Sequence, residues 1–401
     1  MKVVTGGITA VTGILAAGMA AGIKKGKSLD LALIVSEQDA IMAGVFTTNT
    51  VVAPPLILDR QQLRRGKGRA IIVNSGNANA CTGRRGYKDA VTMAALTAKA
   101  LGIPREDVYV SSTGVIGKPL PMEKLKAAIP VLAARLHRQG GTDAAHAIMT
   151  TDTTVKTAAV SDTIGGRTVT VGGIAKGSGM IHPDMATMLA FLATDAKIPR
   201  AVLQRGLRQA TERSFNRIPV DGDTSTNDMV LCLANGMAGN RPLKPGSTDA
   251  RRFQSLLDHV CLDLAKKIAW DGEGATKFVE LRVKGARTQA DALRAAVTIA
   301  TSSLVKTAWF GEDSNWGRTM AALGRSGARI AEDRITILVG PVQIVRRGLG
   351  LGPAAEAKAN AVMKSREFSV TVDLGSGAAD VTVWTTDLTL DYIKINASYR
   401  S

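Results

Sequence analysis

The sequence has few of the side chains that build disulfide scaffolds and metal sites. It contains three cysteines and four histidines in 401 residues. Cys81, Cys232 and Cys261 form no CxxC motif and cannot all pair, which argues against a disulfide framework and a redox motif. His259 and Cys261 lack the further ligands of a zinc site, so we expect them to be structural and expect no metal. This cysteine usage fits the reducing cytoplasm.

Long apolar runs are also missing. The small apolar segment at residues 8–23 is shorter than the roughly 20 residues that cross a bilayer. A basic run at 24–27 follows it, where the cleavage region of a signal peptide would lie. We therefore expect a buried, glycine-rich segment and no membrane partner.

The formal net charge of +17 raises the question of nucleic-acid binding. Aromatic residues make up only 4% of the chain, and none is interleaved with basic clusters to stack on bases. The basic pairs are dispersed, at 24–25, 64–65, 84–85, 251–252 and 346–347. We expect a solvated basic surface that would suit an acidic small substrate rather than a nucleic acid.

Alternating runs of strand and helix character predict an α/β or α+β fold of roughly two or three lobes. Strands are predicted at 29–36, 69–75, 107–112, 187–194, 227–234, 277–285 and 335–345. Helices are predicted at 87–102, 122–139, 200–215 and 291–304. A helix at 354–365 and strands at 368–374 and 379–388 indicate a separate, smaller C-terminal lobe, whose boundary we place near residue 280.

Two motifs suggest ligands that their spacing does not support. Gly348, Gly350 and Gly352 precede a helix, but GLGLG is not the GxGxxG of a dinucleotide site. The carboxylates of residues 220–228, VDGDTSTND, lack the spacing of an EF-hand. We interpret this second segment as a hydrogen-bonded loop that organises a site.

The most unusual segment is GGIAKGSGMIHPDMATMLAFLATDA, residues 172–196. A flexible, glycine-rich approach ends at Ala186 and Thr187, and a strongly apolar strand follows. If Thr187 lies at a strained turn, its hydroxyl can attack the preceding carbonyl to give an ester that water cleaves. The new terminus would combine a nucleophilic hydroxyl with an α-amine of pKa about 7.7–8, which can act as general base. Such a site needs neither a catalytic histidine nor a metal.

The same segment resembles the cleavage segment of the ornithine acetyltransferases, also called glutamate N-acetyltransferases. The resemblance covers nearly the whole chain. Further matching stretches lie at 6–24, 43–55, 73–83 (VNSGNANACTG), 111–117 (SSTGVIG), 150–158 (TTDTTVKTA), 214–228, 271–278 (DGEGATKF), 305–318 and 391–401.

The resemblance implies an architecture like that of N-terminal-nucleophile enzymes, cut between Ala186 and Thr187. An α chain of residues 1–186 would be followed by a β chain of 187–401, in which 187–280 completes the catalytic lobe and 281–401 forms the C-terminal lobe. Thr187 would be the nucleophile, and Thr113 and Gly114 the oxyanion hole. The family further implies an assembly of two α and two β chains.

Five further positions match those that contact substrate in the family. Lys176 would pair a substrate carboxylate and Glu273 a substrate ammonium, while Thr153, Asn396 and Ser401 would donate or accept hydrogen bonds. Asp271 is an acidic alternative to Glu273. The chain departs from the family at Ser401, where threonine is usual, and at Asp184, where asparagine is common. The charge at Asp184, three residues before Thr187, is expected to affect the rate of self-cleavage.

The implied reaction transfers acetyl from N2-acetylornithine to glutamate in arginine biosynthesis, through an acetyl ester on Thr187. It needs no cofactor. Some family members also use acetyl-CoA as a donor, and the residues do not decide whether this chain does. Two alternatives are a related self-cleaving amidohydrolase or aminopeptidase, in which water accepts the acyl group, and an inactive nucleic-acid-associated protein of the same fold.

Overall fold

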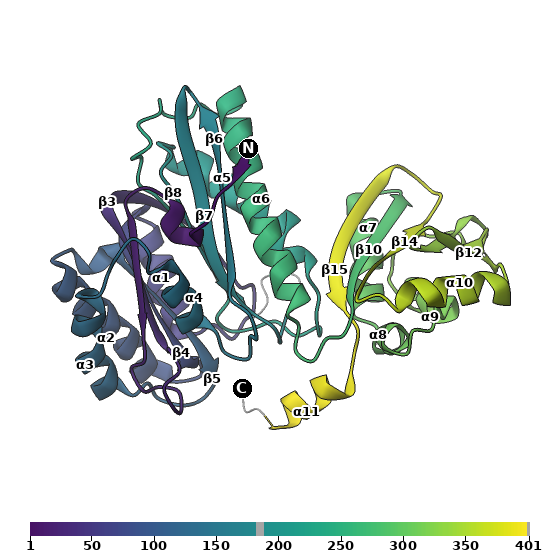
Figure 1. Ribbon diagram of the computed structural model, residues 1–401, viewed down its shortest axis with the longest axis horizontal. Coiled ribbons are helices and arrows are strands. Elements are labelled where there is room, and N and C mark those ends of the chain that lie inside the picture. The colour runs from purple at the N-terminus through teal and green to yellow at the C-terminus, as the bar shows by residue number, and fades with distance from the viewer. Residues whose placement is uncertain (182–187, 399–401) are drawn as a thin grey trace.

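The computed structural model describes residues 1–181 and 188–398, which form two lobes of unequal size (Figure 1). The larger lobe is built on a nine-stranded sheet and the smaller on a six-stranded sheet. Helices flank both sheets. The expected α/β class, with layered sheets, flanking helices and a smaller C-terminal lobe, is confirmed.

The large sheet has the strand order β1-β6-β7-β8-β9-β3-β4-β5, with β2 paired to β3 outside this path. β3 is long enough to pair with β2 through its first half and with β9 through its second half. The strands are β1 (Lys2–Val3), β2 (Ile14–Met19), β3 (Leu31–Phe46), β4 (Lys67–Asn77), β5 (Val108–Val115), β6 (Lys156–Ile164), β7 (Arg167–Lys176), β8 (Leu189–Thr194) and β9 (Met229–Ala234).

β8 lies inside this sheet, antiparallel to β7 and parallel to β9, and every one of its residues is buried. Side chains of a strand point alternately to its two faces. Ala190 and Leu192 accordingly join the core cluster that includes helices α5 (Arg200–Arg213) and α6 (Thr248–Trp270). Leu189 and Phe191 join the cluster that includes α4 (Gly141–Ile148). A strand covered on both sides requires a continuous apolar sequence.

Three helices pack beside β3, β4 and β5 at the other side of the large lobe, in a third core cluster. They are α1 (Pro54–Leu63), α2 (Gly83–Leu101) and α3 (Met122–Ala133). The helix that the sequence predicts at 122–139 ends at Ala133 instead. The backbone of His137 instead pairs with Ala16 of β2 through two hydrogen bonds, a tertiary contact that propensity does not encode.

The smaller lobe has the strand order β13-β12-β11-β14-β10-β15 and its own apolar cluster. Its strands are β10 (Phe278–Ala286), β11 (Thr336–Val339), β12 (Val342–Arg346), β13 (Leu349–Gly350), β14 (Glu367–Asp373) and β15 (Ala379–Thr386). Its helices are α7 (Gln289–Ala300), α8 (Ser303–Phe310), α9 (Trp316–Gly324) and α10 (Pro353–Met363). The predicted strand at 335–345 is a hairpin, β11 and β12, with a turn at Gly340.

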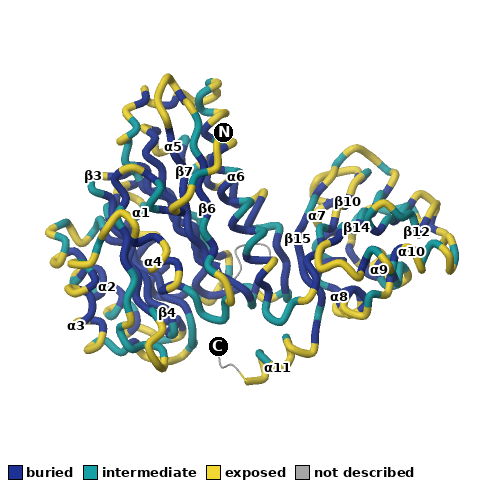
Figure 2. The backbone as a smooth tube through the Cα atoms, viewed as in Figure 1, coloured by how far each residue is buried: buried dark blue, intermediate teal, exposed yellow. Residues whose placement is uncertain are grey.

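The last helix, α11 (Leu390–Ser398), leaves the small lobe after β15 and runs back beneath the large one (Figure 1). None of its residues is buried, in contrast with the dark interior of both lobes in Figure 2. α11 is therefore held by particular polar contacts rather than by a core.

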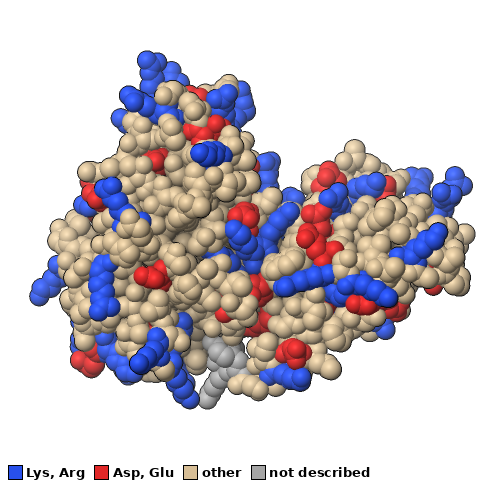
Figure 3. All heavy atoms as spheres, in the orientation of Figure 1, with Lys and Arg blue, Asp and Glu red and all other residues tan. Residues whose placement is uncertain are grey.

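Charged side chains are scattered over the face in Figure 3, where acidic residues lie between the basic ones. Lys24, from one of the basic pairs, departs from the expected solvated surface. It is partly buried, and its Nζ donates to the carbonyls of Leu29 at 2.9 Å and Met149 at 2.6 Å. Within the described ranges, no helix is long and apolar enough to cross a membrane.

Candidate active site

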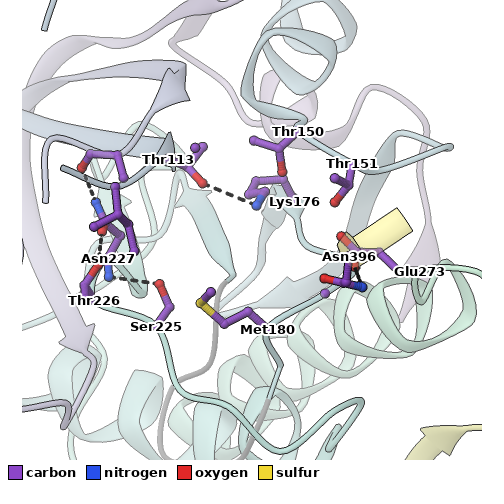
Figure 4. A pocket seen from close by; sticks show the side chains of 14 residues that line it. Thr113, Thr150, Thr151, Lys176, Met180, Ser225, Thr226, Asn227, Glu273 and Asn396 are labelled. Atoms are coloured by element: carbon purple, nitrogen blue, oxygen red, sulfur yellow. Dashed lines mark hydrogen bonds between the residues drawn. The ribbon is translucent and has the colours of Figure 1, made fainter. Parts of the chain in front are cut away.

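A cavity of about 70 Å³ lies where distant parts of the chain meet (Figure 4). Its wall includes five of the residues singled out from the sequence: Thr113, Gly114, Lys176, Glu273 and Asn396. They come from the end of β5, the end of β7, the loop after α6, and α11. The fold thus brings together positions that are up to 283 residues apart, 396 minus 113.

Lys176 is the last residue of β7, and its ammonium is buried in the cavity wall. Its Nζ lies 3.4 Å from the hydroxyl oxygen of Thr113, and among the described residues no carboxylate oxygen comes within 4 Å. Burial lowers the pKa of Lys176, although Asp152, Asp228 and Glu273 oppose that shift from a distance. The cavity therefore contains a cation without a close counter-ion, which suits an anionic group of a ligand.

Thr113 and Gly114 lie at the end of β5, where its pairing with β4 becomes irregular at Gly76 and Asn77. Gly114 has φ +129°, and a Cβ there would collide with the backbone of Gly76. Only glycine fits this turn and this close strand approach. The strand end accordingly places the Thr113 hydroxyl beside the Lys176 ammonium, on the wall where the sequence predicts an oxyanion hole (Figure 4).

Glu273 faces the same cavity from the loop after α6. Its backbone N–H donates to the carbonyl of Ser178 at 2.9 Å, and its carboxylate packs over Gly179, where a Cβ would overlap it. The amide of Asn396 on α11 donates to this carboxylate at 2.9 Å. Glu273 is thus held beside the strand that ends at Lys176, so groups of opposite charge share one cavity.

Asp271, the acidic alternative to Glu273, does not line the cavity and makes its contacts outside it. Its carboxylate accepts hydrogen bonds from the backbone of Thr153 and Thr154 and pairs with the buried Lys156 at 2.6 Å. Thr153 is exposed, does not line the cavity, and donates its hydroxyl to Asp271. The suggested contact between Thr153 and substrate stays a prediction.

The loop at 220–228 binds the backbone on both sides of the predicted cleavage point. Asp221 accepts from the N–H groups of Met180 at 2.6 Å and Ile181 at 2.7 Å, and from the Tyr392 hydroxyl at 3.2 Å. Asp228 accepts from the N–H of Met188 at 3.0 Å. Burial raises the pKa of Asp228 well above its usual range, against the opposing effect of the hydrogen bond from Met188.

Several predicted positions cannot be placed. Ala186, Thr187, Asp184 and Ser401 lie outside the described residues. Sequence reasoning missed other residues of the cavity wall, namely Thr150, Thr151, Ser225, Thr226 and Asn227. They belong to the TTDTTVK and DGDTSTND motifs, whose dense hydroxyl and amide side chains were the available signal.

Comparison with known proteins identifies the family. The model of the ArgJ family matches residues 15–401. The arginine biosynthesis bifunctional protein ArgJ of Symbiobacterium thermophilum is 54% identical over 406 residues, covering 100% of both chains. The protein of the same name from Geobacter sulfurreducens is 52% identical and covers 98% of this chain and 100% of its own.

A solved structure of ornithine acetyltransferase complexed with ornithine, from Mycobacterium tuberculosis, is 44% identical. The match covers 45% of this chain and 97% of that one, with a TM-score of 0.42. The family model and the two full-length relatives extend over both lobes. The chain belongs to the ArgJ family.

Proposed function

We propose that this chain is an ornithine acetyltransferase of arginine biosynthesis, which transfers acetyl from N2-acetylornithine to glutamate through an ester on Thr187. The observation that carries the proposal is the placement of Lys176 and Glu273 on one cavity. N2-acetylornithine has a carboxylate and a side-chain ammonium, with an uncharged amide attached near the carboxylate. A buried cation and a carboxylate can hold the two charged groups and leave the amide to the nucleophile.

The chemistry follows from an N-terminal threonine. The Thr187 hydroxyl adds to the acetyl carbonyl while its α-amine takes the hydroxyl proton. Thr113 and Gly114 stabilise the oxyanion, which collapses as the C–N bond breaks and the proton passes to the leaving amine of ornithine. The neutral amine of glutamate then attacks the ester, giving N-acetylglutamate and free Thr187.

The chain organisation is part of the proposal. Cleavage between Ala186 and Thr187 would give an α chain of 1–186 and a β chain of 187–401, with lobes that divide near residue 280. We propose that two α and two β chains assemble and act in the cytoplasm on these small molecules. Acetyl-CoA as a second donor is an additional activity that the same assay can measure.

Self-cleavage is tested by denaturing mass spectrometry with N-terminal sequencing. We expect two chains from the wild type, the second beginning at Thr187, and one uncut chain of 42.0 kDa from Thr187→Ala. Thr187→Ser, which keeps a hydroxyl and an α-amine, is the matched control and should still cleave. An uncut wild type, or a cut at another bond, would remove the proposed general base and contradict the mechanism.

Product analysis separates transfer from hydrolysis. Cleaved wild type incubated with N2-acetylornithine and glutamate should give N-acetylglutamate and ornithine in equal amounts. An amidohydrolase would instead release acetate and leave glutamate unmodified, and would do so equally well without glutamate.

A further inference from the structure

We propose that Lys156 is a positioning residue for amino-acid binding, which fixes the separation between Lys176 and Glu273 through a buried chain of ion pairs. The inference rests on the proposed function, because it concerns how that substrate's two charged ends are held. Lys156 does not line the cavity, and its side chain is fully buried. Its Nζ lies 2.6 Å from Asp152 Oδ1 and 2.6 Å from Asp271 Oδ2.

The first arm of this chain leads to Lys176. Asp152 Oδ1 accepts the N–H of Gly177, the residue after Lys176, at 2.7 Å, and Oδ2 accepts the N–H of Thr150 at 3.0 Å. The Asp152 side chain is fully buried. Burial alone would raise its pKa, but the ammonium groups of Lys176 and Lys156 outweigh that effect and hold it below its usual range. Asp152 is therefore a fixed anion that anchors the end of β7.

The second arm leads to Glu273. Asp271 Oδ2 accepts the backbone N–H groups of Thr153 at 3.0 Å and Thr154 at 3.2 Å as well as Lys156. Asp271 lies two residues before Glu273, in the loop that ends α6. The position of the Glu273 side chain depends on how firmly the backbone of its loop is held. Here the buried Asp271 carboxylate connects that loop to the backbone of Thr153 and Thr154 and to the Lys156 ammonium.

Lys156 also prevents Asp152 from forming an ion pair with Lys176, the lysine in the cavity wall. Asp152 already has Lys156 as a close partner, whereas Lys176 has no carboxylate within 4 Å among the described residues. Without Lys156, two buried carboxylates would lose the cation that they share, and Asp152 would be left with the attraction of the Lys176 ammonium. The bridge formed by Lys156, Asp152 and Asp271 thus has two effects. It fixes the loop of Glu273, and it leaves Lys176 available to the substrate.

A charge-balanced double variant separates positioning from simple stability. Lys156→Met alone leaves two unpaired buried carboxylates and can fail to fold. Lys156→Met/Asp271→Asn keeps the net charge of the three-residue bridge at −1, because one cation and one anion are removed. The asparagine can still accept from Thr153 and Thr154 through its oxygen and donate to the Thr153 hydroxyl through its nitrogen. Lys267→Met is the control, since Lys267 pairs similarly with Asp263 and the carbonyl of Thr157 but is far more exposed.

The readouts are the yield of folded, cleaved protein and the KM and kcat of acetyl transfer, with ornithine binding measured by calorimetry. We expect the double variant to fold and cleave, with KM for N2-acetylornithine and Kd for ornithine raised about tenfold or more and kcat less affected. Lys267→Met should keep wild-type values. A folded double variant with wild-type KM and Kd would overturn this inference alone. A wild type that neither binds ornithine nor transfers acetyl would overturn the proposed function and this inference with it.

Discussion

Replacing Lys176 by methionine should weaken catalysis while strengthening the fold. The buried ammonium has one long hydrogen bond, 3.4 Å from Nζ to Thr113 Oγ1, and no close carboxylate among the described residues. A hydrogen bond to a charged group contributes about 1.5–3 kcal/mol. Losing one such contact to the substrate carboxylate should lower kcat/KM for N2-acetylornithine by about 10- to 150-fold, at 1.4 kcal/mol per factor of ten.

The sign of the stability change follows from the lowered pKa of Lys176. Its folded-state pKa lies below the value of 10.5 in the unfolded chain, so the charged form is disfavoured by folding. That cost is fully present below the folded pKa and disappears as the pH rises to 10.5. Lys176→Met removes the cost, and the variant should be more stable than wild type at pH 7.

Urea denaturation and steady-state kinetics test both statements. Unfolding is compared in a Thr187→Ala background so that both proteins are single uncut chains, and kinetics are compared in the cleaved enzymes. The wild-type kcat/KM should fall as the pH rises through the pKa of Lys176, and the variant should lack that step. A variant that keeps kcat/KM within twofold, or that is less stable than its parent at pH 7, would refute the reasoning.

Three further outcomes are expected. Gly179→Ala places a Cβ against the Glu273 carboxylate and should raise KM for N2-acetylornithine about tenfold, whereas Gly324→Ala, with open space around it, should not. Lys306→Met removes a buried lysine whose pKa burial lowers to about 7. In urea titrations the wild type should gain stability relative to this variant between about pH 7 and 10.5, and a pH-independent difference would contradict the assignment. Asp228→Asn replaces a carboxyl whose charged form is disfavoured by burial with a group of the same shape. It should change the unfolding free energy by less than about 1 kcal/mol, measured in the uncut background, and a larger loss would contradict this expectation.

Strands and helices whose apolar residues recur with a clear spacing were predictable from the sequence. The apolar run after Thr187 is β8, and its continuous hydrophobicity matches a strand buried on both faces. The longest helix, α6, was missed although its signal is present. Ser247 caps it, and buried residues recur three and four apart from Phe253 to Ala269.

The cavity itself could not be derived from local patterns. Thr113, Lys176, Glu273 and Asn396 belong to four unrelated segments, and only the family resemblance grouped them. The resemblance in turn gave no reason to notice Lys156, because its role depends on two carboxylates that lie 4 and 115 residues away in sequence. Glycine-rich residues 172–176 were interpreted as a flexible approach, but they form the buried end of β7, where Gly172 and Gly173 allow close packing.

A cut in the segment between the paired strands β7 and β8 would change the molecularity of folding. A cut between Ala186 and Thr187 would assign these neighbouring strands to different polypeptides, although they are paired from Val171 opposite Thr194 to Lys176 opposite Leu189. β8 and β9 would then fill the middle of a sheet whose other strands belong to the first polypeptide. The uncut chain would refold in a first-order reaction, whereas the cut protein would have to reassemble two chains in a second-order one. The apparent midpoint of unfolding of the cut protein should therefore fall on dilution, and self-cleavage would make recovery of the fold depend on concentration.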